Sequence, residues 1–513
     1  MTGTAKDGAR SSAQGVTQGV THGATQGVTM RKSIGVVDGV VIAASSTAAT
    51  SSIGIGLGLT AGVVGLHLPA IMLLAFLPVL GIAVAYGRLN RVEPNAGNSY
   101  TWVGRTLNPW LGFLTGWVNI VGTIVFMAYT TAVTGSAVLQ LALEAGLHSV
   151  AGLALDPDST LQTTVLGLVV LAAATLVAIR GLALAARLQK YLLVFEYAVL
   201  LGFCGWGLLV GDQPFSLEWF NPFAIPSMDA LAQGMVLAVF CYWGFESVFT
   251  VAEEVHDPKD ASRGGIFALV MMLLLFVLAG TAFQRVLPLD ELADNGAQGL
   301  TYFGAKLADQ PLAALPLIAL TFSAVASLQA SVIPTARGTF AMGRDRTLGP
   351  VWMRIHPKHG TPAVGTVLLA LVAAAIALLA LVIPTVTDLI SAAVNAIGIV
   401  VVLYYALTAV AAAVRFRHLL RDEPLVGLRV VVAPLVSAAA LLAVGGYLAW
   451  SFYDSADHFE VSADNGWFQL LVPALMIGTG LVAAAWARWV RKSPYFVTGR
   501  GTDADRIELA PSV

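Results

Sequence analysis

The stretch Ala44-Ser45-Ser46-Thr47-Ala48-Ala49-Thr50-Ser51-Ser52-Ile53-Gly54-Ile55-Gly56 lies inside an apolar segment near residues 34–59 that is long enough to cross a bilayer. Its serine and threonine side chains compete with the backbone for hydrogen bonds, and its two glycines weaken a helix. A helix broken at this depth leaves backbone polar groups without partners, unless they face a cavity or a ligand. The stretch therefore predicts either a break beside a binding site or a close helix contact, for which small residues are also common.

A second unusual stretch, Phe240-Cys241-Tyr242-Trp243-Gly244-Phe245-Glu246-Ser247, lies in an apolar segment near residues 228–256, five apolar segments further on. This spacing is typical of two five-helix repeats of opposite topology, whose broken first helices meet in the middle of the membrane. Because the two stretches occupy matched positions, we favour two broken helices over two packed ones. The free N–H groups of one break suit a carboxylate and the free carbonyls of the other suit an ammonium group, as in an amino acid.

The composition indicates that lipid surrounds most of the chain. Of its 513 residues, 57% are hydrophobic and 11% are charged, whereas a soluble domain carries roughly 25% charged residues. Only lipid accepts such an excess of apolar surface, which predicts an all-α membrane protein. About twelve segments are long enough to be transmembrane helices, near residues 34–59, 68–88, 110–140, 161–180, 189–211, 228–256, 264–286, 311–343, 362–383, 386–414, 427–452 and 467–490.

Lysine and arginine gather on one side of this helix order. The outer loops keep Arg285 and Lys306, if both chain ends are cytoplasmic. The inner loops then hold Arg88, Arg91, Arg105, Arg180, Arg187, Lys190, Lys259, Arg263, Arg344, Arg346, Arg354, Lys358, Arg415, Arg417, Arg421 and Arg429. Because cytoplasmic loops are enriched in basic residues, we expect a multi-pass protein of the plasma or inner membrane with both termini cytoplasmic. Asp38 and Arg337 are expected near the same interface, where they either brace the protein or form a gate.

Two further properties restrict the partners of the chain. Its net charge of −2 gives no field that would attract nucleic acid. Residues 1–30 repeat Gln-Gly-Val-Thr and related tetrapeptides, so we expect a disordered cytoplasmic tail. The expected partners are membrane lipid and a small-molecule substrate, and the sequence does not predict an oligomeric state.

Three groups of residues, in the loops and at one of the two breaks, carry a family resemblance: Glu93–Val103 with Leu111–Trp117, Gly244–Ser247 with Ala252–Lys259, and Ala341–Asp345 with Leu348–Pro350 and Thr361–Pro362. They resemble the bacterial permeases of the amino acid–polyamine–organocation superfamily, and the similarity covers most of residues 31–415. The resemblance implies inverted repeats of five plus five helices, at residues 31–211 and 228–414. It also implies two added helices at 427–490 and a cytoplasmic tail at 491–513.

The resemblance also implies a binding site. In that family, N–H groups of a glycine-rich break in helix one hold the substrate carboxylate, and carbonyls of helix six hold its amine. The residues that match these positions, or lie beside them, are Ser46, Thr50, Ser51, Ser52, Phe240, Tyr242, Trp243 and Glu246. Residues 50–52 replace the usual glycines by hydroxyl residues. Tyr242 and Trp243 are expected to form an aromatic lid or simply to pack, and Glu246 matches a carboxylate that is coupled to gating in relatives. Gly122–Met127 and Asn395 are expected to complete the pocket.

A buried carboxyl group is the candidate for ion coupling. Glu196 lies inside the segment 189–211, where a charge costs about 3 kcal/mol or more, so a functional role is the default interpretation. Because burial favours the neutral form of a carboxyl group, we hypothesise that Glu196 carries the coupling proton. The alternatives are a structural carboxylate satisfied by Lys190 or by another neighbour near the cytoplasmic face, or sodium coupling through Ser327 and its neighbours Ser323 and Ser331, spaced four apart on one helix face.

The sequence thus predicts a secondary active transporter for an amino acid, coupled to protons or else to sodium. A polyamine or organic-amine transporter, or an amino acid exchanger, of the same fold is the alternative, and a transport-inactive sensor is a hypothesis of another class. The chain has no Ser/His/Asp or metal-ligand constellation in its spans and no Walker A motif, so we expect neither an enzyme nor an ATP-driven pump, and no cofactor, catalytic residue or metal site. The small, aromatic and mostly neutral pocket favours neutral or aromatic amino acids.

Overall fold

The computed structural model describes Lys32 and residues 34–150, 152–295, 298–379, 381, 386–455, 458 and 465–498. The predicted tail 1–30 and most of the tail 491–513 lie outside this part of the chain. In the described residues the protein is helical apart from one short hairpin, so the prediction of an all-α class is confirmed.

Within the described residues, the first half of the chain contains one interrupted span, the first, and four continuous ones. Its elements are α1 (Val36–Ser46), α2 (Ala49–Ser51), a π-helix (Ser52–Leu57), α3 (Gly58–Val64), α4 (Leu68–Val92), α5 (Ser99–Thr106), α6 (Pro109–Glu144), β1 (Ser149–Val150), β2 (Leu153–Ala154), α7 (Thr160–Arg180) and α8 (Leu182–Val210).

The second half repeats the theme of one interrupted helix followed by long ones. Its elements are 3₁₀ turns (Leu217–Phe220 and Pro222–Ala224), α9 (Met228–Tyr242), α10 (Ser247–Thr250), a 3₁₀ turn (Ala252–Glu254), α11 (Pro258–Val286), α12 (Leu289–Asp294), α13 (Gly299–Leu307), α14 (Ala314–Arg344), a 3₁₀ turn (Pro350–Met353), α15 (Ala363–Leu379), α16 (Val386–Phe416), α17 (Leu419–Asp422), α18 (Pro424–Gly427), a π-helix (Leu428–Val432), α19 (Ala433–Asp454), α20 (Gly466–Ala485), a π-helix (Trp486–Val490) and α21 (Tyr495–Thr498).

Ten helices in the described residues are long and apolar enough to cross a membrane. Two shorter apolar helices, α9 and α15, lie where the sixth and ninth spans are predicted. The fifth span is longer than predicted, because Gly181 at φ 132° makes a one-residue turn and α8 begins directly at Leu182. Arg187 and Lys190 therefore lie on a helix rather than in a loop.

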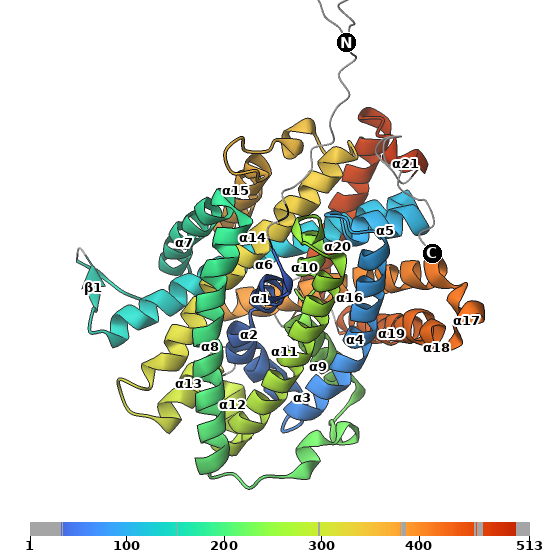
Figure 1. Ribbon diagram of the computed structural model, residues 1–513. Helices are drawn as coiled ribbons and strands as arrows, with labels where there is room; N and C mark the ends of the chain where they lie inside the picture. The colour runs from blue at the N-terminus through green and yellow to red at the C-terminus, as the bar shows by residue number, and fades with distance from the viewer. Residues whose placement is uncertain are drawn as a thin grey trace, which may run out of the picture.

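The molecule has two ends (Figure 1). One end carries the start of α1, the helix α5 and the C-terminal helix α21, and we call it the terminal face. The opposite end carries α12, α13 and the turns between α8 and α9 (Figure 1). The long helices run between the two ends.

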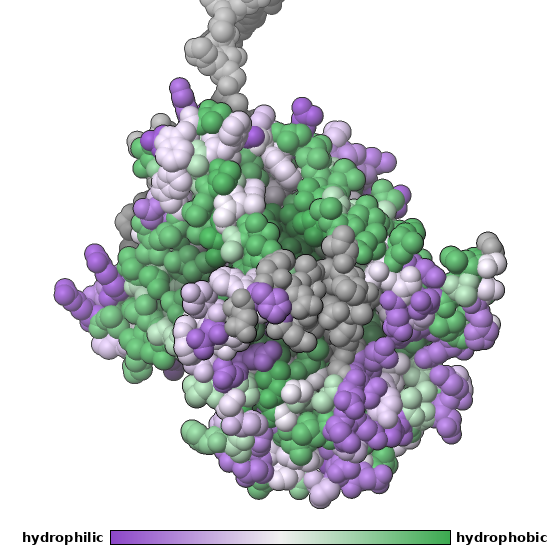
Figure 2. Space-filling view, turned by 180° about the vertical axis from the view of Figure 1, so that it is seen from behind, coloured by the Kyte–Doolittle hydropathy of each residue, from purple (hydrophilic) through white to green (hydrophobic). Residues whose placement is uncertain are grey.

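Burial separates the central helices from the lipid-facing ones. In the apolar stretch of α14, 83% of the residues are buried, whereas the value is 28% for the stretch that begins with α20. Figure 2 shows hydrophobic side chains over much of the rear surface, as expected where lipid replaces water as solvent. In the centre α1 packs against α14, α14 against α6, α6 against α16, and α16 against α9, so the two breaks lie inside the protein.

Candidate functional site

The first span is interrupted at Thr47 and Ala48. Ala48 adopts the left-handed conformation at φ 49°, and α2 resumes directly after it. The hydroxyl groups nearby satisfy the carbonyls that the break frees: Thr47 Oγ1 donates to Ala44 O at 2.8 Å, and Ser52 Oγ donates to Thr47 O at 2.9 Å. A break is therefore present as predicted, but it precedes the expected place at residues 50–52, which are helical.

The second break lies between α9 and α10. Trp243 is extended at ψ 139°, and Gly244 has φ 112°, a conformation that favours glycine. A Cβ atom on Gly244 would lie 2.6 Å from Ser46 O and 2.9 Å from Thr47 N. Glycine is therefore required at position 244 for two reasons: the backbone angle favours glycine, and a side chain would collide with the Ser46 carbonyl. The two breaks touch each other at this point.

Two cavities lie beside this contact. The one we call the central cavity measures about 30 Å³, and the one we call the vestibule measures about 70 Å³ and lies nearer the terminal face. Ser46, Phe126 and Trp243 line both, so they form the partition. The Trp243 ring packs edge-on against Phe126, with ring centres 5.6 Å apart. Of these two cavities, the larger is on the terminal-face side of the partition.

The central cavity is lined mostly by neutral groups: Ser46, Thr47, Ala48, Ser51, Ser52, Gly56, Phe126, Tyr129, Thr130, Val133, Phe240, Trp243, Ser327 and Val394. Two of its polar atoms, Ser51 Oγ and Thr130 Oγ1, are buried without a hydrogen-bond partner. Buried polar atoms in native proteins are nearly always paired, so these two hydroxyls indicate a place where a bound molecule supplies the partner.

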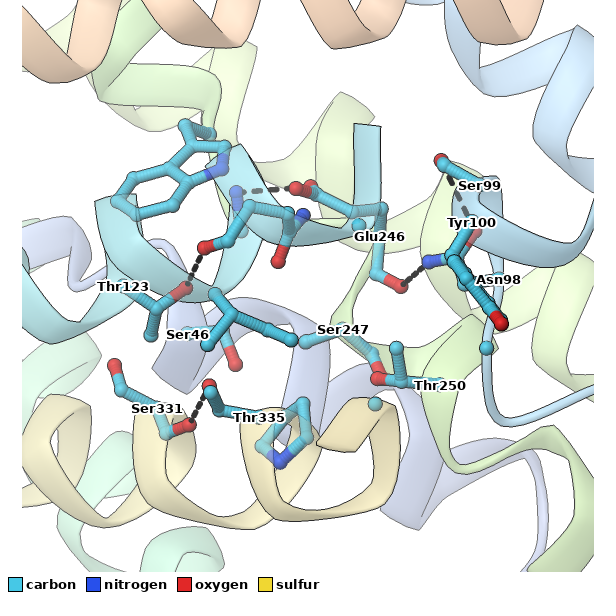
Figure 3. Close-up of a pocket in the computed structure, with 18 of the residues that line it drawn as sticks. Ser46, Asn98, Ser99, Tyr100, Thr123, Glu246, Ser247, Thr250, Ser331 and Thr335 are labelled. Carbon is cyan, nitrogen blue, oxygen red and sulfur yellow. Dashed lines mark hydrogen bonds between the residues drawn. The ribbon is translucent and has the colours of Figure 1, made fainter. Parts of the chain in front are cut away.

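The vestibule is lined by hydroxyl and amide side chains and by the carboxylate of Glu246 (Figure 3). Its polar lining comes from the break of span one at Ser46, from α5 and its link, from α6, from α10 and from α14. Figure 3 shows Ser331 and Thr335 on α14 opposite the segment that carries Glu246 and Ser247. Ser247 Oγ is buried without a partner, like the two hydroxyls of the central cavity.

The Glu246 carboxylate is held by donors from α16 and from the break between α9 and α10. Tyr404 and Tyr405, both on α16, donate their hydroxyl groups to Oε1 at 2.6 Å and to Oε2 at 2.8 Å. The Gly244 N–H donates to Oε2 at 3.0 Å, and Trp243 Nε1 donates to the Tyr404 hydroxyl. The partition tryptophan and the carboxylate thus belong to one hydrogen-bond chain. Sequence reasoning missed the two tyrosines, whose only signal was an adjacent pair of phenols in an apolar helix.

Glu196 is 2% exposed and faces the first span from α8. The Thr50 hydroxyl donates to its Oε2 atom at 3.0 Å, while Oε1 is buried without a hydrogen-bond partner, with Ser323 close to the carboxyl group. Ser323 Oγ also accepts the Ser51 N–H at 3.3 Å. Lys190 is exposed, and no ion pair within the described residues involves Glu196. The alternative of a Glu196–Lys190 pair is therefore wrong.

The remaining predicted site residues divide into two groups. Ser46, Ser51, Ser52, Phe240, Trp243 and Ser327 line the central cavity. Thr50 and Tyr242 line neither cavity: Thr50 binds Glu196, and the Tyr242 hydroxyl donates to Met72 O at 3.1 Å, with its ring against Phe76 and Phe276.

The serines of α14 are mostly bonded to their own helix. Ser327 Oγ donates to Ala324 O at 2.9 Å and Ser331 Oγ donates to Ser327 O at 2.7 Å. Their oxygen lone pairs remain available to a sodium ion. The hydroxyls do not form one cluster, however, since Ser331 lines the vestibule and Ser327 lines the central cavity.

Ion pairs cross-link the terminal face below the vestibule. Arg337 is 1% exposed and its Nε donates to Glu254 Oε1 at 2.8 Å, whereas Asp38 accepts from the Gly35 N–H of its own helix. Asp38 is therefore not the partner of Arg337. Glu253 pairs with Arg344 at 3.0 Å, which joins the segment after α10 to the end of α14 a second time.

The chain is similar to known membrane transporters. The family model described as amino acid permease matches residues 40–482. The methylthioribose transporter of Bacillus subtilis is 28% identical over 320 residues, which cover 60% of this chain and 67% of that protein. The low-affinity putrescine importer of Escherichia coli is 27% identical over 336 residues, or 63% and 69%. The branched-chain amino acid permease of Lactococcus lactis is 24% identical over 315 residues, or 59% and 66%.

Proposed function

The chain belongs to the amino acid permease family, and on this premise we propose that it is a proton-coupled secondary transporter that moves an amino acid across the plasma membrane by alternating access. That it is a transporter, rather than an enzyme, follows from the family and from the transporters to which it is similar. The substrate, the coupling ion and the orientation are the parts that we add.

One observation carries the proposal: two helices are interrupted at the same place, and the interruptions touch through Gly244 and the Ser46 carbonyl. Interrupted helices expose N–H groups at the start of the resumed half and carbonyls at the end of the first half. At membrane depth such groups persist only beside a cavity or a ligand, and the central cavity lies beside them. A substrate carboxylate on the α2 side would accept from the free N–H groups, and a substrate ammonium group on the α9 side would donate to the free carbonyls.

The central cavity favours a neutral substrate. Its described lining contains aromatic rings and hydroxyl groups but no charged side chain. A side chain that is apolar or aromatic can pack against Phe126, Phe240 and Trp243 without leaving a charge unpaired. Neutral or aromatic amino acids are therefore the first substrates to test.

An organic amine is the second candidate, and the vestibule supports it. Among the described residues of its lining, Glu246 is the one acidic or basic side chain, and the other polar groups are neutral. The relatives named above include a putrescine importer and a methylthioribose transporter as well as an amino acid permease. The same site could also exchange one amino acid for another across the membrane. The alternative of another class is a sensor that binds its ligand without transporting it.

Glu196 is our candidate for the proton carrier. Its carboxyl group is buried, contacts the broken span through Thr50, and has no cation within the described residues to hold it in the charged form. Burial of an unpaired carboxylate is costly, so protonation accompanies the buried state and release accompanies exposure to water. The Thr50 hydroxyl links that change to the helix that binds substrate.

We also propose that the terminal face is cytoplasmic. The basic residues of the loops gather there, at the ends of α4, α7, α14 and α16, and the opposite end keeps Arg285 and Lys306. Cytoplasmic loops of membrane proteins show this enrichment. The vestibule then opens toward the cytoplasm.

The test of the proposed function is uptake by proteoliposomes. Purified protein is reconstituted and supplied with radiolabelled leucine, phenylalanine, putrescine or methylthioribose, with an inward proton gradient and without sodium. Concentrative uptake of at least one compound is expected, and thermal shifts against a wider panel identify ligands because a ligand stabilises the state that binds it. Binding without uptake or exchange of any compound would instead indicate a sensor.

A further inference from the structure

The last described segment of the chain, Ser493–Phe496, is buried although it follows the final long helix. Ser493 is 1% exposed and Tyr495 is 0% exposed. The burial of this segment therefore indicates a built docking site on the terminal face.

Two glycines form the slot for the Tyr495 ring. A Cβ atom on Gly104 would lie 2.0 Å from the Tyr495 hydroxyl oxygen, and one on Gly112 would lie 2.4 Å from it. Any larger residue at either position would occupy the space of the phenol. Phe496 extends the contact by packing against Trp110 and Phe113, with ring centres 5.0 and 5.7 Å apart.

Tyr495 holds a wall of the vestibule in place. Its hydroxyl donates to Tyr100 O at 3.0 Å, and the two rings stack with centres 4.6 Å apart and an interplanar angle of 12°. Tyr100 lines the vestibule (Figure 3). Its own hydroxyl is 3.3 Å from Thr347 Oγ1. Tyr100 therefore contacts Tyr495 on one side and faces the vestibule on the other.

The same segment reaches the opposite wall. Ser493 Oγ donates to Asp345 O at 2.9 Å, directly after the end of α14, and also accepts the Tyr495 N–H at 3.3 Å. Met342, near the end of α14, lines the vestibule. The segment thus bridges the α5 wall and the α14 wall of one cavity.

We propose that Ser493–Phe496 is a strap that holds the vestibule narrow, and that release of Tyr495 lets the α5 wall move away from α14. Tyr495 is a positioning residue, since it acts on the vestibule through Tyr100 and lines no cavity itself. The proposal rests on the transporter function, which makes the vestibule a route for substrate, but not on the role of Glu196 or on the substrate.

The test measures access to the vestibule directly. Thr335→Cys places a thiol on the vestibule wall, whereas the native Cys204 and Cys241 are buried elsewhere and report general loosening. In nanodiscs both faces meet a polar thiol reagent, so neither orientation nor transport enters the result. The labelling rate at each cysteine is followed by peptide mass spectrometry.

Tyr495→Phe, which removes only the hydroxyl bond, is expected to raise labelling at Thr335→Cys about fivefold, equivalent to roughly 1 kcal/mol. Tyr495→Ala and Gly104→Ala, which empty or block the slot, are expected to raise it further. Val497→Ala, directly after the segment and 72% exposed, and Gly205→Ala, with nothing within 4 Å of the added Cβ, are the matched controls and should leave it unchanged.

Two results would overturn the strap. One is an unchanged labelling rate at Thr335→Cys in all three slot variants. The other is a parallel rise at Cys204 and Cys241, because it would show that Tyr495 supports the fold in general rather than the vestibule. A substrate or coupling ion different from the proposed one would leave this assay unaffected.

Discussion

The Thr50 hydroxyl donates a hydrogen bond of 3.0 Å to Glu196 Oε2, so the interrupted first span and the buried carboxyl group of α8 are in direct contact. Ala49, which precedes Thr50, directly follows the left-handed Ala48. Ser51, which follows Thr50, lines the central cavity. A change in the charge of Glu196 therefore acts on the same helical turn that faces the cavity.

Thr50→Val keeps the shape of the side chain and removes this bond. We expect the rate of uptake driven by a proton gradient to fall about tenfold, the equivalent of about 1.4 kcal/mol, within the range of about 0.5–1.5 kcal/mol for an ordinary hydrogen bond. The matched control is Thr134→Val, since the Thr134 hydroxyl bonds only to Thr130 O of its own helix, at 2.7 Å. Equal uptake by the two variants in proteoliposomes would show that the Thr50 hydrogen bond has no role in proton coupling.

Gly244→Ala tests the contact between the two breaks. Alanine at φ 112° is strained by about 1–3 kcal/mol, and its Cβ would meet the Ser46 carbonyl at 2.6 Å. We expect a lower thermal midpoint and uptake reduced by more than about tenfold, whereas Gly205→Ala should leave both unchanged, because nothing lies within 4 Å of the added atom. Normal uptake by the Gly244 variant would show that the breaks need not touch.

Tyr404→Phe interrupts the hydrogen-bond chain at the vestibule. Glu246 loses a donor at 2.6 Å and Trp243 Nε1 loses its acceptor, and a buried unpaired group costs about 1–3 kcal/mol. The thermal midpoint without ligand should drop, and the shift produced by substrate should shrink. Tyr453→Phe, at a tyrosine that is 60% exposed, is the control. A substrate-induced shift of normal size would show that this hydrogen-bond chain does not contribute to substrate binding.

The two ion pairs of the terminal face should differ in their contribution to stability. Glu254→Gln leaves the Arg337 charge, 1% exposed, without its carboxylate, at a cost of about 3–5 kcal/mol. Glu253→Gln weakens a pair whose arginine is 32% exposed, at a cost of about 0–1 kcal/mol. Unfolding of both variants in detergent measures the difference. Equal losses would mean that burial does not control the strength of these pairs.

Much of the fold could be predicted from the sequence, because lipid requires long apolar helices and their ends carry the basic loops. The interruptions could be predicted from the hydroxyl and glycine residues of the first span and from Gly244. Their direct contact could not, because only the packing of distant helices brings the Ser46 carbonyl against Gly244.

The orientation of individual site residues was less predictable. A left-handed alanine at position 48, which changes the direction of the chain just before Thr50, has no sequence signal. A straight helix therefore gives the wrong direction for Thr50, which faces Glu196 instead of the cavity. Tyr404 and Tyr405 were missed because aromatic residues in an apolar helix usually pack, and only the tertiary fold brings Glu246 within reach of their hydroxyls.

Proton-driven accumulation by Glu196→Gln in sodium-free proteoliposomes tests the coupling account most directly, with Glu144→Gln, at an exposed position, as the control. Glutamine keeps the size of the side chain but carries no titratable proton. The account predicts that the Glu196 variant still binds and exchanges substrate but no longer concentrates it against a gradient, while the control does both. Full accumulation by the Glu196 variant would contradict it.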